Sequence, residues 1–220
     1  LPRDDQFPLM IQRFAALAYP ERNNPPAEIP NPRLVTDSES TAAAISKFCL
    51  VRDSKVLAIC PGAEFGEAKQ WPSEYYAEIS NSMLARGWQV WLFGSANDEL
   101  VAEAILAHID NRYLEQFQNL VGRTNLAEAI DLMSLSSTVI SNDSGLMHVA
   151  AALMKPVVAI YGSTSPDFTP PLAEKVKLLA TDIECRPCFK RECPYGHLRC
   201  LTELKPELAM ASVESFSAKE

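Results

Sequence analysis

Residues 138–153 read TVISNDSGLMHVAAAL, and this stretch decides the fold. Its first part, Thr138–Ser141, predicts a short buried strand, and its last part, Leu146–Leu153, predicts an Ala-rich helix that packs flat on a sheet. A polar turn, Asn142–Gly145, joins the two directly. A strand that runs straight into a helix is the repeating unit of a parallel α/β sheet.

The same alternation of strand and helix continues on both sides of this stretch. Further strands are predicted at Val56–Cys60, Trp88–Phe93, Asn119–Val121, Pro156–Tyr161 and Val176–Leu179. Further helices are predicted from Ser73, as the capping residue, to Gly87, and over Asp98–Ile109 and Leu126–Leu135. We therefore expect an α/β fold built on a Rossmann-like, doubly wound parallel sheet with helices on both faces.

The first 50 residues differ in character from the rest. A short helical pattern over Pro8–Ala18 is followed by a Pro-rich stretch, residues 20–32. This stretch predicts an extended linker, because proline fixes φ and lacks an amide donor. Asp37–Ser40 is expected to cap a helix that ends near Phe48. We divide the chain into a linker segment, residues 1–50, and a folded domain, residues 51–220.

The composition excludes several classes of protein. Hydrophobic residues make up 47% of the chain and charged residues 22%, as in ordinary globular domains. The 28 acidic residues outnumber the 20 basic ones, so we expect no nucleic-acid partner, because duplex binding needs an excess of Lys and Arg. No stretch approaches the ~20 apolar residues of a membrane-spanning helix, and no secretion signal is recognisable.

The loops that follow the predicted strands hold six of the eight glycines. In an open parallel sheet these loops share one edge, and ligands bind at that edge. The six are Gly62, Gly66, Gly94, Gly122, Gly145 and Gly162. Turn geometry alone accounts for some of them, so the cluster indicates a binding edge without identifying the ligand.

The turn Asn142–Gly145 opens a helix, and a helix N-terminus presents free amide donors and partial positive charge to an anion. Asp143 or Ser144 is expected to cap this helix, and Gly145 would let a phosphate approach the backbone closely. His148, on the first turn, either contacts a diphosphate or the Asp143 carboxylate, or is a partly buried histidine bonded to the backbone.

The loop Pro61–Pro72 is longer than a strand-to-helix turn requires. Its Lys69 is a candidate phosphate-binding cation, as a point charge opposite the helix N-terminus. The alternative is an ordinary solvated surface lysine. The nucleotide fingerprints G-x-x-x-x-G-K-[ST] and G-x-G-x-x-G are both absent.

Four of the six cysteines, Cys185, Cys188, Cys193 and Cys200, cluster near the end of the chain. In the absence of a recognisable secretion signal, we interpret them as reduced thiols or metal ligands rather than disulfides. A tetrahedral zinc site on four thiolates, or on three thiolates and His197, is one alternative. Because the second pair is spaced more widely than in a zinc ribbon, we expect structural thiols, with no metal and no cofactor.

Four ordered blocks of sequence resemble glycosyltransferase family 9, the ADP-heptose:lipopolysaccharide heptosyltransferases. The blocks are Cys60–Gly66 with Lys69 and Trp71-Pro72, Leu92–Ala96, Asn142–Leu153, and Tyr161–Leu172. The resemblance implies a GT-B architecture, in which two Rossmann-like domains face a cleft. This chain then looks like the C-terminal, nucleotide-sugar-binding half, and residues 1–50 hold a remnant of the N-terminal acceptor domain. Residues 206–216 would form the helix that crosses back toward that domain.

The activity implied by the resemblance is an inverting transfer of heptose from ADP-heptose to the lipopolysaccharide inner core. This chain would supply the donor-binding domain and be inactive alone, because the acceptor domain with its catalytic Asp has no counterpart here. The implied partners are the ADP-heptose donor and, through the acceptor domain, the lipopolysaccharide core. The implied location is the cytoplasm, with peripheral contact to the inner face of the inner membrane.

The resemblance also implies roles for individual residues. Lys69, Asp143 and His148 would take part in catalysis, Lys69 by neutralising the diphosphate leaving group. The diphosphate and the adjacent sugar would meet Asp143, Ser144, Gly145 and His148, while Gly62 and Ala63 would approach the diphosphate through the backbone. Adenine and ribose would be flanked by Gly122, Arg123 and Thr124.

Three other functions remain as alternatives. One is another enzyme of the same fold, a UDP-sugar glycosyltransferase or epimerase. A second is a non-catalytic module in which the cysteine cluster forms a zinc-stabilised interaction surface. The third is a phosphate-binding domain of the signalling type, which ranks last because the acidic cluster of such domains is missing at the strand ends.

Overall fold

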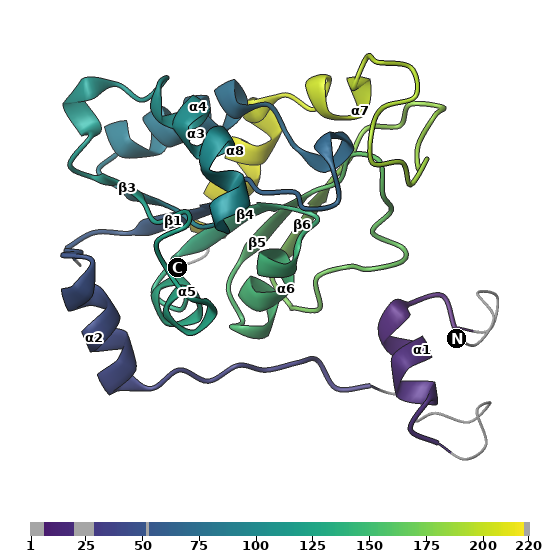
Figure 1. Cartoon of the computed structure of the whole chain (residues 1–220), viewed down its shortest axis with the longest axis horizontal. Helices are drawn as coiled ribbons and strands as arrows, with labels where there is room; N and C mark the ends of the chain where they lie inside the picture. The colour runs from purple at the N-terminus through teal and green to yellow at the C-terminus, as the bar shows by residue number, and fades with distance from the viewer. Residues whose placement is uncertain (1–6, 20–28, 52, 218–220) are drawn as a thin grey trace.

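A six-stranded, fully parallel sheet forms the centre of the computed structural model, which describes residues 7–19, 29–51 and 53–217. The strand order is β3-β2-β1-β4-β5-β6 (Figure 1). The strands are β1 (Val56–Cys60), β2 (Gln89–Leu92), β3 (Phe117–Asn119), β4 (Thr138–Asn142), β5 (Val157–Ile160) and β6 (Val176–Leu179). This is the strand order of the doubly wound Rossmann sheet, and the predicted fold class is confirmed.

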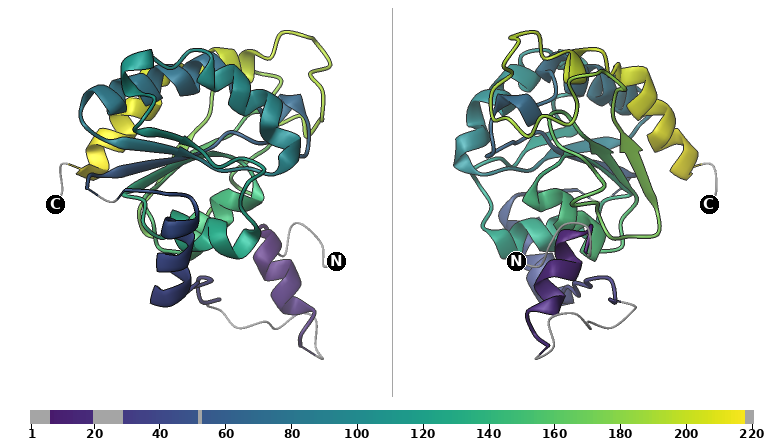
Figure 2. Two further views of the ribbon diagram at one scale, coloured as in Figure 1. Left: turned by 60° about the vertical axis from the view of Figure 1, so that its left-hand side comes forward. Right: turned by 90° about the vertical axis from the view of Figure 1, so that its right-hand side faces the viewer.

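Helices cover both faces of the sheet (Figures 1 and 2). One face carries α3 (Ser73–Ala85), α4 (Glu99–Leu106) and α8 (Pro206–Ser217), and the other carries α2 (Ser38–Lys47), α5 (Leu126–Met133) and α6 (Gly145–Ala152). The shorter elements are α1 (Met10–Ala16), α7 (Arg199–Thr202) and the 3-10 turns η1 (Glu67–Lys69), η2 (Ala96–Asp98) and η3 (Asn111–Tyr113). In the described ranges no helix combines the length and the apolar character needed to span a membrane.

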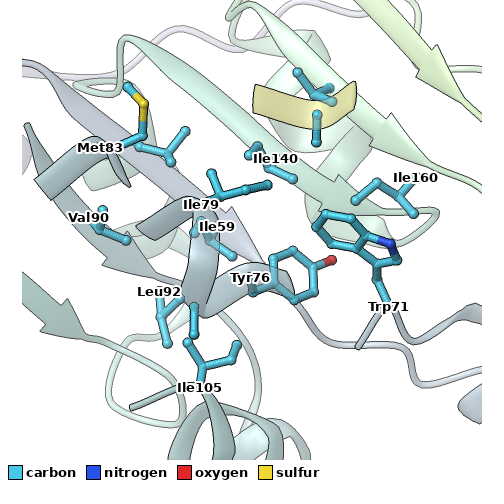
Figure 3. Packing of buried hydrophobic residues seen from close by; sticks show 14 of the residues in the cluster. Ile59, Trp71, Tyr76, Ile79, Met83, Val90, Leu92, Ile105, Ile140 and Ile160 are labelled. Carbon is cyan, nitrogen blue, oxygen red and sulfur yellow. The ribbon is translucent and has the colours of Figure 1, made fainter. Parts of the chain in front are cut away.

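The sheet separates two hydrophobic cores, because successive side chains of a strand point to opposite faces. The core under α3, α4 and α8 gathers aliphatic side chains around two fully buried aromatic rings (Figure 3). These residues include Leu57, Ile59, Val90, Leu92, Ile140 and Ile160, with Trp71 and Tyr76. The opposite core holds Val56, Ala58, Trp91, Phe93 and Val139. Both faces are buried, which explains why the strands are continuous apolar runs in the sequence.

The N-terminal segment packs on the domain through α2, whose Ala44 belongs to the core on the side of α5 and α6. The Asp37 carboxylate caps α2 by accepting hydrogen bonds from the amides of Glu39 and Ser40, as predicted. Residues 29–37 contain neither helix nor strand, and the rest of the predicted linker, residues 20–28, lies outside the described residues, so the linker stays a prediction. The Met10 amide of α1 donates to the Phe168 carbonyl, at 3.0 Å, so α1 contacts the loop that follows β5.

The predicted boundaries differ from the observed ones by up to three residues, and two of these differences have a visible cause. The strand predicted at Asn119–Val121 lies two residues earlier, because the Asn119 side chain accepts a hydrogen bond from the Val121 amide, at 3.1 Å, and turns the chain. Ser73 does not cap α3. It is the first helical residue, and the capping position belongs to Pro72, whose carbonyl accepts from the amides of Tyr75 and Tyr76.

Asn142, at the end of β4, joins this strand to the loop that follows β1. The side chain is fully buried. Its Nδ2 donates to the Pro61 carbonyl, at 2.7 Å, and its Oδ1 accepts from the Tyr76 hydroxyl, at 2.8 Å, and from the Trp71 amide, at 3.3 Å. Strands β1 and β4 are neighbours at the point where the strand order reverses, and ligands bind beside such points.

We expect Asn142→Leu to lower the free energy of unfolding by about 3 kcal/mol, because several buried polar groups lose their partner and each costs roughly 1–3 kcal/mol. Urea unfolding measures this change. Asn111→Leu is the matched control, since Asn111 is exposed on η3, and its effect should stay within about 0.5 kcal/mol. Equal effects of the two substitutions would contradict the role of the buried amide.

Candidate functional site

A cavity of about 610 Å³ opens at the carboxyl ends of β1 and β4. One wall is the loop after β1, another is the N-terminus of α6, and a third is the loop after β2. Of the residues predicted for the site, the cavity brings together Gly62, Ala63, Lys69, Asp143, Ser144, Gly145 and His148. The remaining lining residues are Cys60, Glu64, Phe65, Phe93, Gly94, Ser95, Asp98, Leu126, Leu146, Val149 and Thr169.

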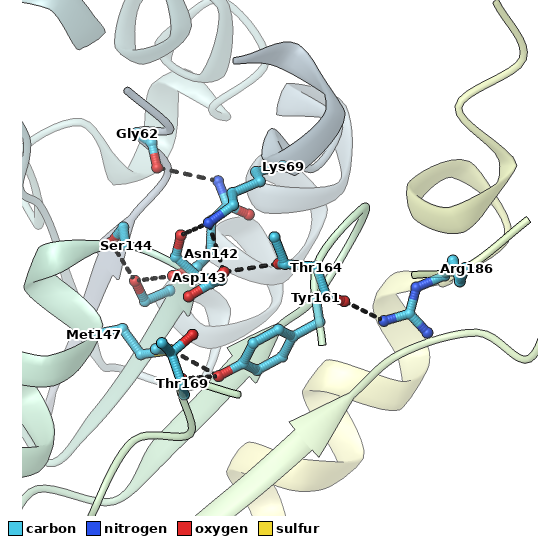
Figure 4. A network of polar contacts seen from close by, with 11 residues as sticks. Gly62, Lys69, Asn142, Asp143, Ser144, Met147, Tyr161, Thr164, Thr169 and Arg186 are labelled. Carbon is cyan, nitrogen blue, oxygen red and sulfur yellow. Dashed lines mark hydrogen bonds and ion pairs between the residues drawn. The ribbon is translucent and has the colours of Figure 1, made fainter. Parts of the chain in front are cut away.

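Lys69 and Asp143 form an ion pair in this cavity (Figure 4). The Lys69 Nζ lies 2.6 Å from the Asp143 Oδ2, and the Thr164 hydroxyl donates to the same oxygen at 2.7 Å. The Lys69 ammonium also lies 4.9 Å from the centre of the Phe65 ring. The two charged side chains are only 14% and 6% exposed, so the alternative of a solvated surface lysine is wrong. The ammonium is held in place before any ligand arrives.

The N-terminus of α6 has no side-chain cap. Ser144 occupies the capping position, but its hydroxyl hydrogen-bonds with the Ser141 hydroxyl, at 3.1 Å, instead of a helix amide. The Asp143 carboxylate is engaged by Lys69 and Thr164. The predicted side-chain capping was therefore wrong. The first-turn amides keep their capacity to bind an anion at the edge of the cavity.

Gly145 and Gly62 both line the cavity, but the space around the two positions differs. A methyl group added at Gly145 would have no heavy atom within 4 Å, and the backbone there is not left-handed. Neither packing nor conformation therefore demands glycine at this position, and its missing side chain leaves space beside the α6 amides. A methyl group at Gly62 would meet the Asp98 carboxylate at 2.4 Å, so Gly62 is required by the packing of the loops.

His148 lines the cavity from the first turn of α6. Desolvation lowers the pKa of its imidazole below the usual value; the Asp143 carboxylate opposes this shift and the Lys69 ammonium adds to it. The ring is therefore neutral at pH 7. It has no hydrogen-bond partner among the described residues, neither Asp143 nor the backbone, so both ring nitrogens are available to a ligand.

Gly122, Arg123 and Thr124 do not line this cavity. Gly122 forms the turn after β3, with φ at +70°. The Arg123 guanidinium donates to the Asn119 carbonyl, at 3.1 Å, and lies over the Phe48 ring. Their contact with adenine and ribose stays a prediction.

On the side of β2, sequence reasoning placed Gly94 at the binding edge but missed Asp98 and Leu126 as parts of a wall. This wall is formed by Phe93, Gly94, Ser95, Asp98 and Leu126. The Asp98 carboxylate accepts hydrogen bonds from the Ser95 amide and hydroxyl, at 2.8 and 2.9 Å. The available signal was the Ser-x-x-Asp spacing after the strand, which is a capping pattern and places the carboxylate back over the loop.

The four clustered cysteines do not line the cavity. Cys200 is buried, and Cys185, Cys188 and Cys193 are partly exposed. The Cys193 Sγ is 4.0 Å from the His197 Nδ1. In the ranges that the structure describes, no three His, Cys, Asp or Glu side chains come close enough together to hold a metal ion, so no observation supports the zinc-stabilised module.

Comparison with known proteins gives consistent matches. A family model for glycosyltransferase family 9 (heptosyltransferase) matches residues 2–199. Lipooligosaccharide heptosyltransferase 2 of Haemophilus influenzae is 38% identical over 97% of this chain and 64% of that protein. Lipopolysaccharide heptosyltransferase 2 of Escherichia coli is 35% identical over 98% of this chain and 64% of that protein.

The solved structure of E. coli ADP-heptose lipopolysaccharide heptosyltransferase II superposes with a TM-score of 0.88 at 33% identity. The superposition covers 100% of this chain and 65% of that one. The chain thus spans slightly less than two thirds of the length of these relatives.

We expect the acid stability of the domain to depend on His148. Its pKa is lowered in the folded state, so below about pH 6.5 the unfolded chain binds the proton more tightly and stability falls as the pH falls. His148→Gln should lose less stability than the wild type between pH 7.5 and 5.5 in urea unfolding. His108→Gln, in the exposed turn after α4, controls for the loss of an imidazole. Parallel profiles for wild type and His148→Gln would show that the His148 ring is well solvated.

Proposed function

This chain belongs to glycosyltransferase family 9, as its motifs predict, and we propose that it is the donor-binding domain of a heptosyltransferase of the lipopolysaccharide inner core. The donor is ADP-heptose, and the reaction inverts the configuration at the anomeric carbon. One observation carries the proposal: Lys69 and the uncapped N-terminus of α6 converge on one cavity where the strand order reverses. This arrangement binds a diphosphate through a lysine and backbone amides.

The chemistry of the transfer fits these groups. The bond from the anomeric carbon to the diphosphate oxygen breaks, the acceptor oxygen forms the new bond from the opposite face, and negative charge develops on the leaving ADP. Electrostatic stabilisation of that charge is a large part of such catalysis. The Lys69 ammonium and the α6 amides provide it from fixed positions, since Asp143 already holds Lys69 at 2.6 Å. Asp143 therefore acts on the diphosphate through Lys69.

His148 complements these groups as a neutral imidazole. With its pKa lowered by burial, it donates one hydrogen bond to the diphosphate or to a sugar hydroxyl without adding charge. The apolar wall near Phe93 and Leu126 takes the nucleoside, with Gly122–Thr124 at its outer rim.

The acceptor side of the reaction lies outside this domain in our proposal. Removal of the proton from the attacking hydroxyl needs a general base, which the resemblance assigns to the acceptor domain. The lipopolysaccharide core is presented there, at the cytoplasmic face of the inner membrane. The domain described here turns over no substrate by itself.

Calorimetric titration of the chain with ADP, ADP-heptose and UDP tests the proposal. We expect the two adenine ligands to bind and UDP to bind more weakly. Lys69→Ala should weaken ADP binding about ten- to hundredfold, because a hydrogen bond to a charged group contributes roughly 1.5–3 kcal/mol. Lys177→Ala, on the exposed edge strand β6, is the matched control. Equal binding of UDP would favour the UDP-sugar alternative, and no binding by the wild type would contradict the proposal.

Gly145→Ala separates binding from folding. A methyl group at this position points into open space, so the free energy of unfolding should change by less than about 1 kcal/mol. The Kd of ADP should rise about tenfold or more, because overpacking a filled site costs roughly 1–3 kcal/mol. Unfolding and calorimetry on the same preparation measure both. Unchanged ADP affinity would show that the diphosphate does not lie on the N-terminus of α6.

A further inference from the structure

The Cys-rich segment, residues 181–200, has no part in the function proposed above, yet it contacts two loops beside the cavity. The Arg191 carbonyl accepts a hydrogen bond from the Ala68 amide of η1, at 3.0 Å. The Phe189 amide donates to the Ser163 carbonyl, at 2.8 Å. The segment therefore lies against the lysine-bearing loop on one side and against the loop after β5 on the other.

Arg186 is the side chain that joins this segment to the site. Its guanidinium donates to three backbone carbonyls, those of Gly162 at 2.5 Å, Thr181 at 2.5 Å and Thr164 at 3.0 Å. Figure 4 shows the bond to Thr164. Two of them belong to the loop after β5, and the third is at the start of the Cys-rich segment. A planar guanidinium has donors in fixed directions and can hold several acceptors in one arrangement, which a flexible ammonium cannot do as well.

Arg186 is a costly residue to place here. It is partly buried, and no described carboxylate accepts a hydrogen bond from it. Desolvation lowers the pKa of its guanidinium, and the nearby Cys200 and Asp182 oppose this shift. A partly desolvated charge that meets only neutral carbonyls is a weak source of stability. Its position is better explained by the geometry that it imposes on the loop after β5.

Thr164 connects Arg186 to the ion pair. Its carbonyl accepts from Arg186, and its hydroxyl donates to the Asp143 oxygen that also binds Lys69. The neighbouring Ser163 hydroxyl is buried and has no partner among the described residues. The side chain of Ser163 therefore does not fix this loop, and the hydrogen bonds to its backbone do.

We propose that Arg186 is a positioning residue of the donor site. By holding the carbonyls of Gly162 and Thr164, it keeps the Thr164 hydroxyl on the Asp143 carboxylate, and so keeps the Lys69 ammonium aimed at the diphosphate. The Cys-rich segment carries this arginine across to the site. The inference rests on the proposed function for the identity of the ligand, whereas the geometry of the ion pair is independent of it.

Two readouts on the full chain test the proposal. The first is the rate at which Lys69 is acetylated by an N-hydroxysuccinimide ester without ligand, followed by mass spectrometry. The second is the Kd of ADP. In Arg186→Gln we expect both to rise about three- to tenfold, as for the loss of a buried hydrogen bond, with the far-ultraviolet circular dichroism unchanged. Arg186→Lys keeps the charge without the planar fork, should shift both readouts in the same direction, and serves as the second variant if Arg186→Gln does not fold.

Arg199→Gln is the matched control, since Arg199 lies in the same segment and its exposed side chain pairs with Glu203. It should change neither readout. Thr164→Val removes the hydroxyl alone, and adding Arg186→Gln to it should increase the effect by no more than about twofold, because both act on one carboxylate.

A folded Arg186→Gln with wild-type Lys69 reactivity and ADP affinity would overturn the proposal, as would full additivity with Thr164→Val. If the wild type does not bind ADP, the proposed function fails, and the acetylation rate of Lys69 still decides the role of Arg186.

Discussion

The buried amide of Asn142 is the contact on which the whole site depends. The crossovers after β1 and β4 leave for opposite faces of the sheet, so a crevice opens between their ends. In that crevice the Asn142 side chain bonds to the Pro61 carbonyl, the Trp71 amide and the Tyr76 hydroxyl. The loop that carries Lys69 is thereby fixed at both of its ends to the strand that precedes Asp143. The position of the cation therefore depends on a buried group that does not line the cavity.

The Lys69–Asp143 ion pair has two opposing effects on anion binding. It fixes the position of the ammonium in advance, and it partly neutralises the positive charge. An unpaired charge at this depth would lose hydration without compensation. Pairing with Asp143 provides that compensation but also reduces the net positive potential available to a diphosphate. The free amides of α6 supply the rest of the attraction as dipoles, without a second cation. For the proposed function, such a balance would hold the ADP leaving group with moderate strength, which suits a product that must depart.

The sequence predicted the parts of this arrangement that are local. The strand, turn and helix at 138–153, the long loop bearing Lys69, and the glycine edge all follow from short patterns, and they fix which residues share the cavity. Two contacts could not be predicted, the Arg186–Gly162 bond and the Asn142–Pro61 bond. Their partners lie 24 and 81 residues away in the sequence, and both acceptors are backbone carbonyls, which have no sequence signature. The capping of α6 failed for a related reason. A local rule assigned Ser144 and Asp143 to the helix amides, whereas the Ser144 hydroxyl bonds to the nearby Ser141 and the Asp143 carboxylate pairs with Lys69, 74 residues away.

The missing cap on α6 has a physical meaning of its own. Helices normally satisfy their first amides with a side chain, and leaving them open costs about 1 kcal/mol relative to a good cap. Here Asp143 and Ser144 directly precede the helix, but their side chains bond to Lys69 and Ser141 instead of the helix amides. Gly145 leaves the space in front of these amides empty. The simplest account is that the ligand is itself the cap. An anion bound there would satisfy the first-turn amides of α6, which are otherwise without a cap. Binding and local stability are then coupled, because a ligand that binds only the folded state stabilises that state. In the proposed function, the construction of the site around an open helix end links the donor to the stability of the domain as well as to the chemistry.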